Sequence, residues 1–161
     1  MFNFLKKSKS ILIKMPFEGD VVDLKTVPDQ VFSQKMIGDG FAILPKAGIH
    51  TVCSPCDGQL IQIFPTNHAI GIKSDEGIEM LIHIGIDTVE LKGEGFERLL
   101  EPPCPLKAGQ AILKFDEAAI KALNKASITP VVFTEMKLIK TISVHYGALK
   151  TGDVVCEITL E

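Results

Sequence analysis

Short apolar stretches, alternating or continuous and separated by glycine, proline and asparagine turns, fill most of this chain. Such spacing is typical of β-strands joined by tight turns. The frequency of these runs predicts an all-β fold, an antiparallel sandwich or barrel of short strands. The expected strands span residues 19–24, 59–64, 69–73, 78–82, 111–115, 131–133, 138–144 and 154–160.

One short helix is expected at residues 117–125. Asp116 precedes this segment, and an aspartate side chain can accept a hydrogen bond from a free N–H group of the first helical turn. The alanines that follow have high helix propensity, and together with Leu123 they give the segment a modest apolar face. The rest of the pattern contains no comparable helical signal.

The first sixteen residues contain four lysines and no acidic residue. Their longest apolar run, at residues 11–13, is much shorter than the roughly 7–15 residues of an export signal or the about 20 of a spanning helix. We therefore expect residues 1–16 to form a basic flexible tail and residues 17–161 to form a single domain. The alternative for the tail is an interfacial helix that weakly contacts anionic lipid.

The composition changes this picture little. A chain of 161 residues that is 46% hydrophobic and 23% charged can bury one sizeable core. Its net charge of −3 argues against nucleic-acid binding, for which a basic stripe would be expected. Proteins and small molecules are the expected partners, and the chain is expected to be a monomer.

Two histidines flank a predicted β-hairpin. Residues 74–77 contain the Asp and Gly of a turn, and a four-residue loop there would pair Lys73 with Ile78. That register sets His68 directly opposite His83, with Cβ atoms roughly 4.5–5.5 Å apart. A shift by one residue would send the rings to opposite faces of the sheet, unless a bulge at Gly77 restored the parity.

The histidine pair has several chemical interpretations. A phosphohistidine site is the leading hypothesis, because a neutral imidazole is a nucleophile near pH 7. Core histidines bonded to the backbone and a zinc site remain open on these residues alone. Zinc needs three or four protein ligands, and the chain contains neither H-E-x-x-H nor H-x-H, so a further ligand would have to come from elsewhere or from a partner.

The segments around these histidines resemble the glucose-family IIA component of the bacterial sugar phosphotransferase system, which has a β-sandwich fold. The resemblance implies that His83 accepts a phosphoryl group from the phosphocarrier HPr and passes it to a cysteine on the IIB domain of a sugar permease, in the cytoplasm or at the inner face of the membrane. No cysteine here has the setting of that IIB cysteine. The matching segments are residues 31–40, 66–68, 83–96 and 129–132.

Four residues receive roles in the site from this resemblance. His68 would stabilise the phosphoryl group, and the Thr66 hydroxyl would belong to the same hydrogen-bond network. The backbone carbonyl of Gly85 would hold the Nδ1–H of His83 and leave its Nε2 free to attack. No cofactor is required, although His68 and His83 could bind zinc if a partner carboxylate completed the site.

A partner would need a landing surface around the histidines, and some relatives also regulate other proteins. Asp39 and Asp87 lie in matching motifs and could complement a basic partner. Apolar residues near these motifs are the other candidates, with burial in the core as their alternative. These residues are Phe32, Met36, Ile37, Phe41, Phe64 and Ile70.

Two other functions are alternatives. The sequence around Met136 and Lys137 resembles the turn on which biotinyl and lipoyl carrier domains are modified, at Lys137, but this reading leaves both histidine motifs unexplained. A zinc metallopeptidase of related β architecture is weakened by the missing H-x-H. Cys53 and Cys56 form a single C-x-x-C without a second pair, so we expect them to be small residues that flank a turn.

Overall fold

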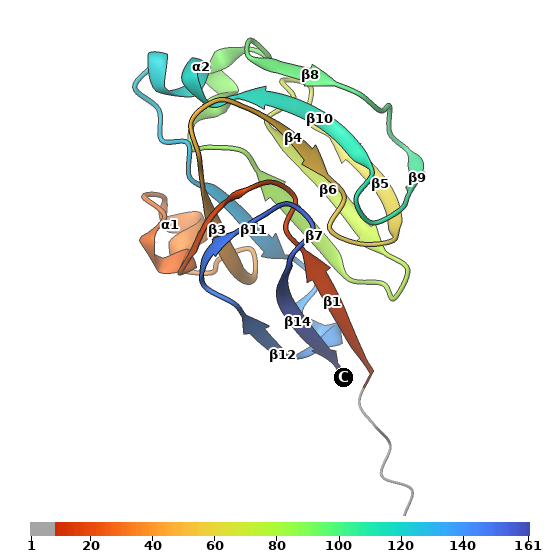
Figure 1. Ribbon diagram of the computed structural model, residues 1–161. Helices are drawn as coiled ribbons and strands as arrows, with labels where there is room; N and C mark the ends of the chain where they lie inside the picture. The colour runs from red at the N-terminus through yellow and green to blue at the C-terminus, as the bar shows by residue number, and fades with distance from the viewer. Residues whose placement is uncertain (1–8) are drawn as a thin grey trace, which may run out of the picture.

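Antiparallel strands make up most of the structure, a computed structural model that describes residues 9–161 (Figure 1). The largest of its three sheets has eight strands in the order β13-β2-β3-β11-β7-β6-β5-β9. These strands are β2 (Gly19–Val22), β3 (Asp39–Pro45), β5 (Gly58–Ile63), β6 (Ala69–Ser74), β7 (Glu79–His83), β9 (Cys104–Leu106), β11 (Thr129–Phe133) and β13 (Gly147–Leu149).

Two smaller sheets complete the sandwich. One has the order β1-β14-β12, and the other has the order β4-β10-β8. Their strands are β1 (Ser10–Lys14), β4 (Ile49–Cys53), β8 (Phe96–Arg98), β10 (Ala111–Asp116), β12 (Ile139–Val144) and β14 (Val154–Leu160). In Figure 1 the first lies at the bottom and the second at the top. Buried apolar side chains from all three sheets form one main core, so both small sheets pack on the same face of the large one.

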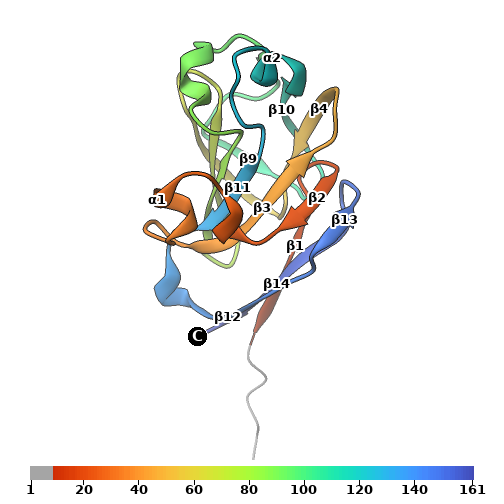
Figure 2. The same ribbon diagram turned by 90° about the vertical axis from the view of Figure 1, so that its left-hand side faces the viewer.

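The opposite face of the large sheet carries a second, smaller apolar cluster. Phe41 and Ile43 of β3 belong to the main core, whereas Ala42 between them belongs to the second cluster, as the two-residue period of a strand requires. Helix α1 (Gln30–Ser33) and the 3-10 helix η1 (Leu24–Thr26) cover this face, and Figure 2 shows α1 beside β3 and β11. The candidate functional site lies on this face.

The all-β sandwich expected from the sequence is confirmed, and every expected strand is present with small shifts at its ends. Helix α2 (Glu117–Ala122) is shorter than expected, and its cap is as expected, since the Asp116 carboxylate accepts a hydrogen bond from the Ala118 N–H at 3.0 Å. The sequence pattern did not reveal α1, the strands β1, β3, β4, β8, β9 and β13, or the 3-10 helices η1, η2 (Thr88–Leu91) and η3 (Met136–Leu138).

The N-terminal segment differs from the expected tail of residues 1–16. Ser10–Lys14 form β1, which pairs with β14, and Ile13 and Met15 are fully buried. Alternation along residues 11–15 places apolar side chains in the main core and lysine outside it. Residues 1–8, which are half of that segment and hold two of its four lysines, lie outside the described residues. In the part of the chain that is described, no helix is long and apolar enough to cross a membrane.

Candidate functional site

Strand β7 directs His83 toward the face covered by α1. Its neighbours Ile82 and Ile84 are fully buried in the main core, so the side chain between them points the other way. There the imidazole contacts the ring of Phe32, with centroids 5.1 Å apart. Its Nδ1 lies 2.7 Å from the carbonyl oxygen of Gly85. Because a carbonyl can only accept, Nδ1 carries the proton and Nε2 keeps a free lone pair.

The Gly85 carbonyl is held by the backbone around it. Gly85 has φ of +72°, and a Cβ there would lie 2.6 Å from Thr88 Cγ2 and 2.9 Å from the Ala126 carbonyl oxygen. The next residue, Ile86, donates its N–H to that same Ala126 oxygen at 2.9 Å. Only glycine combines this left-handed conformation with so close an approach.

The hairpin register differs from the expected one by one residue. Lys73 pairs with Glu79 and not with Ile78, so Ala69, and not His68, lies opposite His83. The loop is one residue shorter than expected, because the Ser74 backbone N–H donates to the Ile78 carbonyl and the Ser74 hydroxyl accepts from the Ile78 N–H, which pairs these two residues and leaves only residues 75–77 in the turn. The prediction that the two histidines are directly opposed is therefore wrong.

The two imidazole rings nevertheless meet. If β6 continued regularly before Ala69, His68 would share the face of Ile70, which points into the main core. Strand β6 instead begins at Ala69, after a turn in which Asn67 has φ of +66°. The His68 and His83 ring centroids lie 5.0 Å apart at an interplanar angle of 77°. This contact depends on the turn and not on strand pairing alone.

Side chains of the same turn surround His68. Its Nδ1 lies 2.5 Å from the hydroxyl of Thr66, and its ring meets that of Phe64 edge to face at 5.6 Å. The Nδ1 atoms of both histidines are engaged, so their Nε2 atoms are the ring nitrogens that could react with a ligand. The family resemblance implies a site made of Thr66, His68, His83 and Gly85, and the structure brings these four residues together.

Burial keeps both imidazoles neutral at neutral pH. Burial is the main cause that lowers the pKa of His68 to about 4, and the neighbouring His83 adds to it. Burial also lowers the pKa of His83, against the opposing effects of the Gly85 carbonyl and the carboxylates of Asp29 and Asp87. A neutral imidazole with a defined proton position is a competent nucleophile.

The acidic candidates separate in space. Asp87 is exposed at the start of η2 and acts electrostatically on His83. Asp39 instead pairs with Lys35 at 3.4 Å and lines a cavity with Tyr146. Sequence reasoning missed Asp29, which caps α1 and also acts on His83. An aspartate just before a helix indicates a helix cap, and this local signal does not reveal that Asp29 lies near His83.

The apolar candidates divide into buried and exposed groups. Phe41 and Ile70 are fully buried in the main core, so they cannot form a landing surface, and the expectation is wrong for these two. Phe32 is buried under His83, while Phe64 is half-buried. Met36 and Ile37 are exposed, as are two residues that the sequence analysis did not name, Val31 in α1 and Val89 in η2.

The remaining candidates lie apart from the histidine pair. The four cysteines are free thiols, and burial raises the pKa of Cys56 to about 12, so this thiol stays protonated at neutral pH. Lys137 lies in η3, not at the tip of a hairpin. Across residues 9–161 no group of three or more His, Cys, Asp or Glu side chains could hold a metal ion.

Comparison with known proteins places the chain in a family. The sequence profile described as "phosphoenolpyruvate-dependent sugar phosphotransferase system, EIIA 1" matches residues 11–139. The chain is 40% identical over 153 residues to the glucose-specific EIIA component of Buchnera aphidicola subsp. Baizongia pistaciae, covering 95% of this chain and 90% of that protein. The solved structure of glucose permease IIA from Mycoplasma capricolum matches with a TM-score of 0.83 and 36% identity, covering 98% of this chain and 99% of that chain.

Longer relatives contain a similar segment. The glucosamine-specific EIICBA component of Bacillus subtilis is 52% identical over 119 residues, which are 74% of this chain and 18% of that protein. The glucose-specific EIICBA component of Staphylococcus carnosus is 43% identical over 144 residues, covering 89% of this chain and 21% of that protein. The chain thus spans about a fifth of these relatives. These matches do not favour a biotinyl carrier or a metallopeptidase, and they show that the chain belongs to the EIIA 1 family of the phosphoenolpyruvate-dependent sugar phosphotransferase system.

Proposed function

We propose that this chain is a phosphocarrier that takes a phosphoryl group from phospho-HPr on Nε2 of His83 and passes it to the cysteine of a permease IIB domain, supporting sugar uptake. The observation that carries the proposal is the 2.7 Å bond between His83 Nδ1 and the Gly85 carbonyl. It fixes the tautomer in which Nε2 is unprotonated, inside a site where burial keeps the ring neutral.

Each transfer exchanges one bond to phosphorus for another. The Nε2 lone pair forms a new N–P bond while the N–P bond to the donor histidine breaks. In the onward step a cysteine thiolate forms an S–P bond while the N–P bond to His83 breaks, and the electron pair returns to Nε2. Phosphoryl transfer mainly needs in-line alignment and stabilisation of charge on the equatorial oxygens, and neighbouring side chains supply both.

His68 is the proposed stabilising group. If the Thr66 hydroxyl donates its proton to Nδ1 at 2.5 Å, the Nε2 of His68 carries the other proton and can donate it to a phosphoryl oxygen on His83. The 5.0 Å separation of the ring centroids supports this role, because the two rings are close enough for one phosphoryl group to contact both. Thr66 thus sets the tautomer of His68 as Gly85 sets that of His83.

The proposed partner surface surrounds this pair. Met36 is 67% exposed beside the end of α1, and a groove of about 500 Å³ lined by Phe64 and Leu81 adjoins the other side. The carboxylates of Asp29 and Asp87 favour a partner whose surface is basic. This function implies a monomer that acts in the cytoplasm, at the inner membrane face where the permease is reached.

We propose that zinc can bind the histidine pair but is not required for the phosphocarrier function. Two imidazoles supply half of a tetrahedral set, so a carboxylate from a partner would have to complete it. We expect calorimetry to show weak zinc binding by the isolated chain, lost in His68→Gln, and tighter binding when a partner is present. Tight binding without a partner would contradict this expectation and favour a metalloenzyme.

The phosphocarrier proposal is tested by incubating the protein with radiolabelled phosphoenolpyruvate, the first enzyme of the system and HPr. We expect one acid-labile label per chain, mapped to His83 by mass spectrometry and discharged by purified IIB domains. Omitting HPr is the control and should leave the protein unlabelled. Failure to acquire label, or acid-stable label on another residue, would overturn the proposal.

A further inference from the structure

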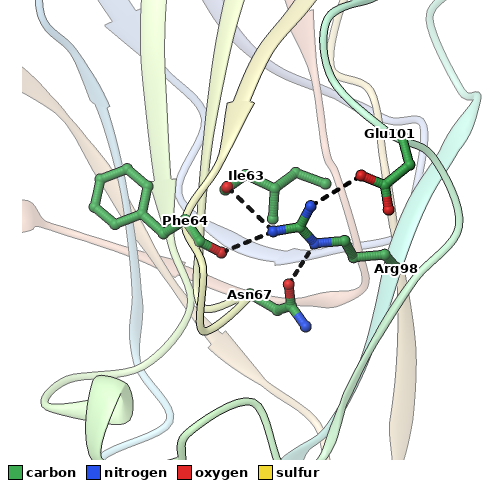
Figure 3. A network of polar contacts seen from close by, with 5 residues as sticks. All are labelled: Ile63, Phe64, Asn67, Arg98 and Glu101. Carbon is green, nitrogen blue, oxygen red and sulfur yellow. Dashed lines mark hydrogen bonds and ion pairs between the residues drawn. The ribbon is translucent and has the colours of Figure 1, made fainter.

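The turn that presents His68 is held by an arginine from another sheet. Arg98 ends β8 in the β4-β10-β8 sheet, whereas the turn joins β5 to β6 in the large sheet. Its Nε donates to Asn67 Oδ1 at 2.5 Å, and its Nη2 donates to the carbonyl oxygens of Ile63 and Phe64 at 3.3 and 3.2 Å (Figure 3). The guanidinium therefore binds both the start and the end of the turn.

This turn decides where the His68 ring points. The residue before His68 is Asn67, whose φ of +66° is the conformation that releases His68 from the regular strand geometry. A non-glycine residue in this region costs about 1 kcal/mol or more and persists when its surroundings hold it there. Within the turn itself, the Asn67 N–H donates to the Phe64 carbonyl at 2.7 Å. Arg98 adds the bonds that come from outside the turn.

A cation so close to a phosphohistidine site could instead bind the phosphoryl group directly. The contacts argue against this, because each of the three guanidinium nitrogens already has an acceptor, with Nη1 donating to Glu101 Oε2 at 3.1 Å. The Arg98 side chain is 26% exposed, while that of Glu101 is 77% exposed. The inward contacts of Arg98 are thus made to the turn, and Glu101 meets it from the solvent side.

We propose that Arg98 is a positioning residue for phosphoryl transfer, which locks the turn at residues 64–67 so that His68 faces His83. This inference rests on the proposed function. Arg98 is the single arginine among the 17 basic residues of the chain. Its planar fork can serve the Asn67 amide and two carbonyls together, which the point charge of a lysine cannot do.

The test compares Arg98→Lys with the control Glu101→Gln, which removes only the outer ion pair. Single-turnover rates are measured for transfer from phospho-HPr to the protein and from the phosphoprotein to IIB. We expect Arg98→Lys to slow the onward step about tenfold to a hundredfold, since a displaced His68 no longer meets the phosphoryl group. Acceptance should change less, because the His83 tether does not involve Arg98. Glu101→Gln should leave both rates near those of the native protein.

A spectroscopic measurement separates positioning from general stability. In nitrogen-15 NMR spectra, Arg98→Lys should change the tautomer signature of His68 and weaken the proton contacts between the two imidazoles, while the His83 signals keep their Nδ1–H pattern. Asn67→Gly is the second variant, because glycine tolerates the left-handed conformation and lacks the side chain that carries the Oδ1 acceptor. Both substitutions break the same contact, so their effects on the onward rate should not be independent. The onward rate of the double variant should therefore fall by less than the product of the two single-variant fold-changes.

The outcomes are distinct. An Arg98→Lys protein that transfers onward at the native rate, or in which both steps fall equally with unchanged His68 signals, would overturn the positioning role. Independent, multiplicative effects of the two substitutions would also overturn it. If the native protein takes no phosphoryl group from HPr, the proposed function fails. The NMR comparison then still decides whether Arg98 orients His68.

Discussion

The two histidines of the site are held in different ways. The main chain holds His83: it ends a central strand, and the carbonyl two residues later fixes its ring. Side chains hold His68: it follows a turn that depends on the Thr66 hydroxyl and on Arg98 from another sheet. The orientation of the His83 ring, which is proposed to form the covalent bond, can therefore be disturbed by fewer substitutions. The ring that is proposed to stabilise charge depends on two side chains, one of which comes from another sheet.

The largest effect should come from His83→Gln. Glutamine keeps polarity and approximate size but has no nucleophilic nitrogen, so we expect no acid-labile label after incubation with phospho-HPr. Thermal unfolding should remain cooperative, which controls for loss of the fold. Label at the native yield on this variant would exclude His83 as the acceptor.

His68→Gln should separate the two transfer steps. Acceptance on His83 should persist, because the nucleophile and its Gly85 tether are intact, whereas onward transfer to IIB should slow by ~10²–10³, the typical cost of losing one preorganised donor. Paired single-turnover rates measure this. A collapse of acceptance with normal donation, or label on His68 in the native protein, would reverse the two roles.

Gly85→Ala tests whether the main chain really fixes His83. The added Cβ meets Thr88 and the Ala126 carbonyl, so we expect a loss of unfolding free energy of about 1–3 kcal/mol and slower acceptance. Gly109→Ala is a matched control, because Gly109 has φ of +88° with no atom within 4 Å of the added Cβ. If denaturant unfolding finds both variants equally destabilised, the requirement for glycine at position 85 would come from its positive φ and not from the close approach of Thr88 and Ala126.

The last prediction concerns stability in acid. The folded pKa of His68, about 4, lies below the ordinary value of 6.5, so the unfolded chain takes up the proton first as the pH falls. The stability from keeping this ring neutral is complete above pH 6.5 and is lost between pH 6.5 and 4, on the order of 3 kcal/mol. Chemical denaturation at pH 7.5 and 4.5 should show a smaller acid loss for His68→Gln than for the native protein. An equal loss of unfolding free energy in both proteins would contradict the conclusion that His68 is buried in its neutral form.

Local features of the fold and site were predictable, and non-local ones were not. The family resemblance implied two contacts between residues two apart, Thr66 with His68 and His83 with Gly85, and both hydrogen bonds are present. The hairpin register was missed because it depends on the backbone conformation at Gly77, where φ is +95°, and a residue count cannot reveal this. Asp29 and Arg98 reach the site only through folding, and no local spacing connects them to the histidines.

The pairing of β1 with β14 has a consequence for the order of events during synthesis. Ser10 pairs with Thr159, so the first described strand finds its partner only after the residues between them have been made. The hairpin of β6 and β7 can close on the ribosome long before that, because its two strands are adjacent in the sequence. Until residues 154–160 emerge, β1 and β12 both lack the strand that lies between them. The nascent chain would therefore expose apolar side chains such as Ile13 during that interval, when chaperones would be most needed.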